Sequence, residues 1–235
     1  MDLGGRAGHR LHLHGIHGDP RLVGGEGILD GDLDLPPDGN RVALIQEILQ
    51  SRAEQRRHEL LAWLDVPFVV DVADVDERPR AGEPSAALVA RLARAKAAAV
   101  VARRAGDWVL GADTTVDLDG VTLNKPRDRD EAAGMLARLG GREHRVFTGF
   151  ALLAPGGAVH AAEVVESRVR FRPLTKTAIA AYVATGEPYD KAGAYAIQGR
   201  GAGLIAGVDG SFSNVMGLPL GEVERALREA GLLRA

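Results

Sequence analysis

The sequence predicts an α/β fold in which helices flank a mixed, twisted sheet. From about residue 41 onward, strand-like and helix-like segments alternate irregularly, as they do in α/β or α+β proteins with mixed sheets. Hydrophobic residues make up 46% of the 235 residues and charged residues 26%, which is typical of a soluble globular protein. A chain of this length can bury a sizeable core without a metal or a disulfide.

Five segments carry the periodicity or the end signals of helices. The predicted helices span residues 51–64, 85–106, 129–141, 175–187 and roughly 219–232. The first has an amphipathic pattern. The second begins at Ser85, a residue type that caps helices, and ends at Gly106. Gly140 stops the third, and Thr175 caps the fourth.

Strand patterns occupy the stretches between these helices. Residues 66–74 form a β-branched run, and residues 107–113 read as a buried strand. Residues 144–174 read as strands on either side of a Pro-Gly-Gly turn. We see no internal repeat and no linker after residue 41.

The first forty residues differ from the rest of the chain. They are rich in glycine, lack Phe, Tyr, Trp and Lys, and hold histidines at positions 9, 12, 14 and 17. These histidines have no carboxylate or cysteine partners at the spacing of a metal site, so we expect none there. We predict that residues 1–40 are a disordered or spurious extension and that residues 41–235 form the functional domain.

Composition excludes several classes of function. The chain has no cysteine, which rules out disulfides, thiolate zinc sites and a cysteine nucleophile and fits a cytoplasmic location. The net charge of −3 gives no indication of nucleic-acid binding. No apolar run approaches the roughly 20 residues of a membrane helix, and the N-terminus lacks the apolar core of a signal peptide. We therefore expect neither nucleic acid nor membrane as a partner.

Residues 111–128, "GADTTVDLDGVTLNKPRD", are the strongest candidate for chemistry. An Asp-Gly pair flanked by alternating apolar residues is a strong hairpin signal, and its register places Lys125 opposite Thr114 and close to Asp113. Only four of the 29 basic residues are lysines, although coding bias favours arginine here. An ammonium beside a carboxylate suits chemistry on a polyanion, with a strand-end salt bridge as the equal alternative.

Two further stretches have open interpretations. The segment "DVDERP", residues 74–79, groups three carboxylates and is either a metal site or a solvated turn. The segment "GSFSNVMGLPL", residues 210–220, either cradles phosphate with backbone amides or is a capping loop with Asn214. No Walker-type loop and no GxGxxG fingerprint is present, so the common phosphate and dinucleotide folds are disfavoured.

Eight motifs in order resemble the Maf family of septum formation inhibitors and nucleoside triphosphate pyrophosphatases. The match covers roughly residues 48–232 and consists of "RRHELL", "DVDE", "RLARAKA", "GADTTV", "NKPRD", "LGGREHRVFTG", "GEPYDKAGAYAIQG" and "SFSNVMGLPL". The resemblance implies a cytoplasmic homodimer with two lobes around a central cleft, related in fold to inosine triphosphate pyrophosphatase. It also implies cleavage of a nucleoside triphosphate to the monophosphate and pyrophosphate, with Mg²⁺ or Mn²⁺ as cofactor.

The resemblance also implies roles for individual residues. Asp113 and Glu77 would be catalytic and would hold the metal, although the sequence does not separate metal ligand from general base. Lys125 would join them at the catalytic centre. The substrate would be bound by Arg56, Arg57, Lys96, Lys191 and Gln198, of which Gln198 would help to read the base. The form "DKAGAYAIQG" resembles the subgroup that prefers dTTP and UTP.

One segment departs from the family pattern. The family opens with a strand that runs into "ASxSPRR", whereas this chain has "QSRAEQRR", with Arg52 and Glu54 in place of serines and Gln55 in place of proline. The preceding residues, 41–49, read poorly as that strand and could extend the helix. The departure leaves an alternative, a catalytically weak nucleotide-binding or regulatory protein of the same family.

Overall fold

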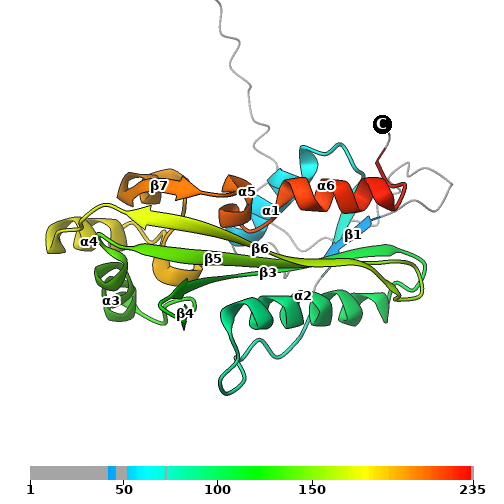
Figure 1. Ribbon diagram of the computed structural model, residues 1–235, viewed down its shortest axis with the longest axis horizontal. Coiled ribbons are helices and arrows are strands. Elements are labelled where there is room, and N and C mark those ends of the chain that lie inside the picture. The colour runs from blue at the N-terminus through cyan, green and yellow to red at the C-terminus, as the bar shows by residue number, and fades with distance from the viewer. Residues whose placement is uncertain (1–41, 46–51, 72, 234–235) are drawn as a thin grey trace, which may run out of the picture. The chain divides into compact units, whose positions relative to one another are not determined.

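A seven-stranded mixed sheet forms the centre of the structure (Figure 1). The computed structural model describes residues 42–45, 52–71 and 73–233, with side chains from Arg56 onward. The strands are β1 (Val42–Ile45), β2 (Phe68–Asp71), β3 (Trp108–Leu118), β4 (Val121–Leu123), β5 (Glu143–Leu153), β6 (Val159–Phe171) and β7 (Ile205–Asp209). The predicted extension, residues 1–40, lies outside the described residues, so that boundary stays a prediction.

The strand order is β2-β1-β3-β5-β6-β7, and β4 pairs with β3 on its own. Strand β1 runs parallel to both β2 and β3, whereas the other pairs are antiparallel. The prediction that residues 41–49 extend the first helix is therefore wrong for Val42–Ile45. These residues are strand β1 because the sheet offers them a hydrogen-bonding partner along both edges, a gain that local pattern does not reveal.

The helices cover both faces of the sheet. They are α1 (Arg52–Ala62), α2 (Ser85–Val101), α3 (Arg129–Leu139), α4 (Lys176–Val183), α5 (Phe212–Met216) and α6 (Leu220–Glu229), with 3₁₀ helices η1 (Ala192–Ala194) and η2 (Gly199–Leu204). Figure 1 shows α2 along one face of β3, β5 and β6, with α1, α5 and α6 on the other face. The predicted α/β class, a mixed sheet with flanking helices, is confirmed.

The end signals of the helices were predicted with mixed success. The Asp128 carboxylate accepts from the Glu131 N–H and caps α3, and the Thr175 hydroxyl caps α4 as predicted. The prediction for Ser85 is wrong, because Pro84 holds the N-cap position of α2. The Ser85 hydroxyl instead makes 2.7 Å hydrogen bonds inside the protein, to Asp117 Oδ2 and to the Thr122 hydroxyl.

Helix α2 also ends at Val101 and not at Gly106 as predicted. The two arginines that follow it, Arg103 and Arg104, both form ion pairs with Asp71 at the end of β2. These contacts draw the chain back towards the sheet before the glycine is reached.

Alternation along β3 divides the core between the two faces of the sheet. Val109 packs with α2, whereas the next residue, Leu110, packs in the cluster that holds Leu60 of α1 and Val223 of α6. A third cluster, around Leu136 of α3, fills the other end of the sheet.

Two glycines allow α2 to approach the sheet very closely. A Cβ atom on Gly111 would lie 2.4 Å from the Ala93 carbonyl oxygen, and one on Gly149 would lie 2.5 Å from the Val89 carbonyl oxygen. Gly149 is the antiparallel partner of Asp113 in the β3–β5 ladder. The absence of side chains at these positions therefore sets the distance between α2 and the strand that carries Asp113.

Candidate active site

A cavity of about 510 Å³ lies between α1, α2, β3 and the segment 190–197. Its wall includes Val116 and Tyr195 from the core cluster around α3, and Ile197 and Met216 from the cluster around α1 and α6. The cavity therefore lies between two clusters of the core, which agrees with the predicted central cleft.

Lys96 lies at the centre of the charged part of this cavity. Its ammonium donates to Asp113 Oδ1 over 2.8 Å and forms an ion pair with Glu77 Oε1. Lys96 follows Leu88 and Leu92 on α2 at helical spacing, so the face that packs on the sheet also carries the lysine. Only 8% of Lys96 is exposed, and the close approach of α2 brings it to the carboxylates.

The charged groups in this cluster shift one another's pKa values. Burial alone would lower the pKa of Lys96, but the carboxylates of Asp113 and Glu77 raise it overall. Burial alone would raise the pKa of Glu77, but Lys96, and after it Lys125 and Arg57, lower it overall. The lysine and Glu77 are thus both charged at neutral pH, and the ammonium draws two carboxylates to one point.

Lys125 reaches the same cavity through the predicted hairpin. Leu118 pairs with Val121 as predicted, around a two-residue turn in which Asp119 and Gly120 both have positive φ, 54° and 80°. The ladder ends at Leu123, so Lys125 does not pair with Thr114, and that part of the predicted register is wrong. Thr114 pairs with Thr148 of β5, which lies along the opposite edge of β3 from β4.

Two arginines of α1 line the cavity beside this cluster. Arg57 Nε donates to the Gly217 carbonyl over 2.9 Å, and its Nη2 reaches the Thr114 hydroxyl at 3.4 Å. Burial lowers the pKa of Arg56, while the charge of Asp190 works in the opposite direction. The side chains of residues 50–55, where the family motif departs, lie outside the described residues.

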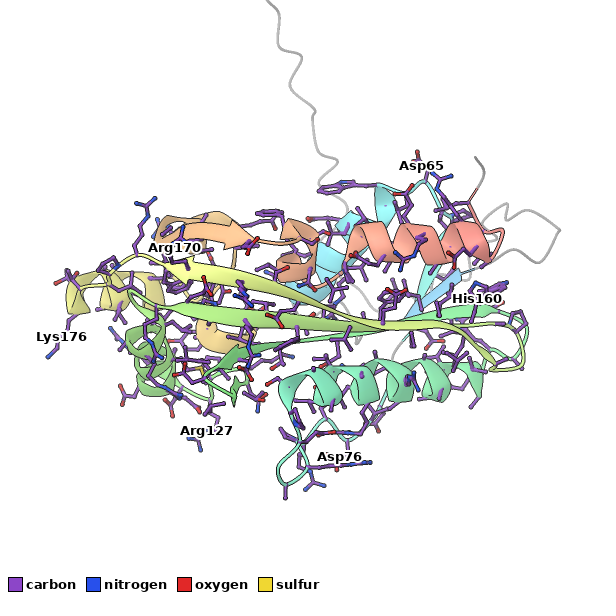
Figure 2. The ribbon with its side chains drawn as sticks, viewed as in Figure 1. Asp65, Asp76, Arg127, His160, Arg170 and Lys176 are labelled. Carbon is purple, nitrogen blue, oxygen red and sulfur yellow. The ribbon has the colours of Figure 1, made fainter. Side chains whose placement is uncertain are left out.

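Lys191 is the second buried lysine in the cavity wall, with 4% of its surface exposed. Its Nζ donates to the Glu187 carbonyl over 2.8 Å and to Asp190 Oδ1 over 2.6 Å. Burial lowers its pKa below the ordinary value for lysine, and the Asp190 carboxylate offsets part of this effect. Lys176, by contrast, is exposed at the start of α4 and does not line the cavity (Figure 2).

The predicted site residues thus share one cavity, with one exception. Arg56, Arg57, Glu77, Lys96, Asp113, Lys125 and Lys191 all line it. Gln198, which we expected to help read the base, precedes η2 and is not part of the lining. Its proposed role remains a prediction.

The structure provides an interpretation for the two stretches that the sequence left undecided, residues 74–79 and 210–220. Asp76 lies on the loop before α2 and binds Arg78 through both carboxylate oxygens, at 2.8 and 2.7 Å (Figure 2). Among the described residues, no group of three acidic, histidine or cysteine side chains could hold a metal on its own. In the second stretch Asn214 is fully buried and donates to Val146 O and Ser167 Oγ, so it fastens α5 to the sheet.

The donor set of the cavity nevertheless fits a hard divalent cation that is shared with a phosphate ligand. Mg²⁺ usually takes one or two carboxylates from the protein and completes its shell with water and substrate phosphate oxygens. Asp113 and Glu77 meet at the same ammonium group and supply such a pair. The predicted metal residues therefore lie close enough together to act jointly.

Sequence reasoning missed several residues of the cavity. Asp190 lines it beside Lys191, and Thr115 lines it with a buried hydroxyl that finds no hydrogen-bond partner in the described part of the protein. The adjacent Asp-Lys pair was the available signal for Asp190, because a buried lysine needs a neighbouring carboxylate. Nothing in the local pattern distinguishes Thr115 from an ordinary strand residue.

The fold and the cavity together define an α/β protein suited to chemistry on a bound polyanion, since cations surround a pair of carboxylates. The family model described as "Maf-like protein" matches residues 48–230. The chain therefore belongs to the Maf family, as the sequence motifs predicted.

Three similar proteins are each named dTTP/UTP pyrophosphatase. The dTTP/UTP pyrophosphatase of Myxococcus xanthus (strain DK1622) is 54% identical over 185 residues, which cover 79% of this chain and 93% of the relative. The dTTP/UTP pyrophosphatase of Symbiobacterium thermophilum is 49% identical over 187 residues, 80% of this chain and 95% of the relative. The dTTP/UTP pyrophosphatase of Moorella thermoacetica is 48% identical over 192 residues, 80% and 97% respectively.

Among solved structures, a nucleoside-triphosphatase or dITP/XTP pyrophosphatase from Mycobacterium abscessus matches 56% of this chain and 74% of its own. The identity is 16% and the TM-score 0.36. A TM-score this low does not establish a shared fold, so the predicted relation to inosine triphosphate pyrophosphatase stays a prediction.

Proposed function

We propose that this protein hydrolyses dTTP and UTP to the nucleoside monophosphate and pyrophosphate. The observation that carries the proposal is the Lys96 ammonium held between Asp113 and Glu77 inside a cavity rimmed by further cations. Relatives at 48–54% identity that bear the name dTTP/UTP pyrophosphatase support the choice of substrate.

The reaction begins with a water molecule that attacks the α-phosphorus. The Asp113 carboxylate accepts the proton of this water, a bond forms between the water oxygen and the α-phosphorus, and the bond to the bridging oxygen of pyrophosphate breaks. Lys96 orients this carboxylate through the 2.8 Å hydrogen bond to Oδ1. The second oxygen of Asp113 then remains for the water.

The cations of the cavity stabilise the charge that builds up on the phosphate oxygens. Arg57 is fixed by the Gly217 carbonyl, so its guanidinium is preorganised before the substrate arrives. Lys125 is exposed on the loop after β4 and supplies a mobile point charge. The cations that line the cavity outnumber its carboxylates, which are Asp76, Glu77, Asp113 and Asp190.

A divalent cation, Mg²⁺ or Mn²⁺, belongs to this proposal. Asp113 and Glu77 would hold it, and when bound it would neutralise the triphosphate and the leaving pyrophosphate. Their meeting point at Lys96 supports this assignment, because it brings two carboxylates together without a third protein ligand.

Assembly and location are further parts of the proposal. The resemblance to the family implies a homodimer in the cytoplasm, which analytical ultracentrifugation and cell fractionation would test. None of the described helices combines the length and the apolar character of a membrane span.

The test is pyrophosphate release from dTTP, UTP, CTP and GTP with Mg²⁺ or Mn²⁺, in the natural chain and in Asp113→Asn. Release from dTTP and UTP that falls at least about a hundredfold in the variant supports the proposal. Asp130→Asn, an exposed change on α3, serves as the control. A folded protein that binds nucleotide but releases nothing would instead be the weak binder that the altered segment 50–55 suggests.

A further inference from the structure

The bases of the proposed substrates, thymine and uracil, share a hydrogen-bonding edge that cytosine lacks. Thymine and uracil present an N3–H donor between two carbonyl acceptors, whereas cytosine presents an acceptor at N3 and an amino donor beside it. A site that selects the former needs an unpaired acceptor next to a donor. The inference below rests on the proposed function and concerns which residue makes this selection.

The carboxylates of the cavity differ in their free capacity. Arg78 occupies both oxygens of Asp76, and Lys96 holds Glu77 and Asp113 at the catalytic cluster. Asp190 accepts from Lys191 through Oδ1 over 2.6 Å. Its Oδ2 is buried and has no hydrogen-bond partner within the described residues. Buried acceptors are usually paired with protein or water, so an acceptor in a cavity wall with no protein partner is able to accept from a ligand.

Lys191 supplies the neighbouring donor. An ammonium group has three N–H bonds, and Lys191 uses two of them, for the Glu187 carbonyl and for Asp190. Its side chain is only 3% exposed, so the third N–H is also held within the wall. Asp190 and Lys191 therefore offer an acceptor and a donor side by side.

The protonation state of Asp190 suits this role. Burial alone would raise its pKa, but the hydrogen bond and the charge of Lys191 lower it overall. The carboxyl group is thus ionised at neutral pH and acts as an acceptor only.

The surrounding wall suits a planar base. The same segment continues into Tyr195, Ala196 and Ile197, all buried and all part of the cavity lining. An aromatic ring and small apolar side chains give a base a surface to lie against. About a quarter of the Asp190 side chain (27%) is exposed, so its carboxylate is not sealed off from the cavity that it lines.

We propose that Asp190 is a specificity-determining residue that accepts the N3–H of thymine or uracil, while Lys191 donates to an adjacent base carbonyl. The pair matches the imide edge in both donor and acceptor, and it mismatches cytosine at N3, where two acceptors would face each other. Asp190 would thus exclude CTP as well as bind dTTP and UTP.

The test measures binding, so that it does not depend on turnover. The dissociation constants of dTTP and of 3-methyl-dTTP, which lacks the N3–H, are measured by calorimetry on chains that carry Asp113→Asn. With Asp190 present, we expect the methylated nucleotide to bind at least about tenfold more weakly, which corresponds to 1.4 kcal/mol. With Asp190→Ala added, the two nucleotides should bind within about twofold of each other.

Asp190→Asn gives the sharper result, because its amide keeps an oxygen for Lys191 and turns an NH₂ donor towards the base. We expect this variant to shift the ratio of UTP to CTP binding towards CTP by about tenfold or more. Asp209→Asn, an exposed change on β7, should leave both ratios unchanged. Inorganic triphosphate, which has no base, should bind the Asp190 variants as it binds the parent, which shows that they remain folded.

Equal binding of dTTP and 3-methyl-dTTP to the chain with Asp190 would overturn the inference without the need for any Asp190 variant. Discrimination that persists in Asp190→Ala would overturn it as well. Failure of the proposed function would be detected in a different assay, as a lack of pyrophosphate release by the natural chain.

Discussion

The close contact between α2 and β5 predicts how a methyl group added at Gly149 would affect activity and stability. In Gly149→Ala the new Cβ would lie 2.5 Å from the Val89 carbonyl oxygen and 2.7 Å from its carbonyl carbon. Both atoms belong to the backbone of α2, so no side chain can rotate away. Ordinary contact begins at 3.4 Å, and the helix must therefore move by about 0.9 Å, the difference between 3.4 and 2.5 Å.

This movement reaches the catalytic cluster directly. Lys96 lies about two turns further along α2, and its 2.8 Å hydrogen bond to Asp113 would open to as much as about 3.7 Å if the helix moved as a rigid body along this bond. A contact that long is no longer a hydrogen bond. We expect kcat/KM for dTTP to fall about a hundredfold. The free energy of unfolding should decrease by about 1–3 kcal/mol, the usual cost of an overpacked core.

The assay combines steady-state pyrophosphate release with urea unfolding. Gly134→Ala is the matched control, since Gly134 lies exposed within α3 and its added Cβ would meet nothing within 4 Å. That change should leave kcat/KM unaffected and stabilise the fold by about 0.5–1 kcal/mol. If Gly149→Ala has the activity and stability of the natural chain, the argument that glycine sets the position of α2 is refuted.

Three further predictions concern the wall, the core and the metal. Glu187→Gln should raise KM for dTTP about tenfold with little change in kcat, and an unchanged KM would refute this. The reason is that Glu187 Oε2 accepts from the Arg200 N–H, a bond that the NH₂ of glutamine cannot accept while the amide oxygen keeps the Gly201 N–H and the Tyr182 hydroxyl. Burial lowers the pKa of His144 to about 4, so its contribution to stability is complete above its ordinary pKa of 6.5 and declines as the pH falls towards 4. Urea unfolding across this range should show the natural chain losing about 2–3 kcal/mol more than His144→Gln, and equal losses would contradict the assignment. Removal of divalent cations with EDTA should abolish pyrophosphate release and added Mg²⁺ should restore it, whereas full activity in EDTA would exclude the metal from the mechanism.

Local signals in the sequence predicted the features that depend on a few neighbouring residues. The Asp119-Gly120 turn follows from the positive φ that both positions must adopt. The cap at Thr175 follows from its hydroxyl, which accepts a hydrogen bond from the N–H group three residues ahead. Lys125 could be placed in the cavity because the hairpin reverses the chain over a short distance.

Features that depend on distant partners could not be predicted in this way. Ser85 has the chemistry of an N-cap, but the buried carboxylate of Asp117, 32 positions away, takes its hydroxyl. Strand β1 exists because β2 and β3 flank it, and neither neighbour is visible in its own pattern. Asp190 became a candidate only once its second oxygen was found buried and unpaired. Family motifs supplied what local pattern did not, and they placed Glu77, Lys96 and Asp113 in one site.

The most direct test of the central claim is a single turnover of dTTP in H₂¹⁸O, with the products analysed by mass spectrometry. Attack at the α-phosphorus predicts one ¹⁸O atom in dTMP and none in pyrophosphate, with a rate at least about a hundredfold lower in Asp113→Asn. Label in pyrophosphate, release of orthophosphate, or an undiminished rate in Asp113→Asn would contradict the account.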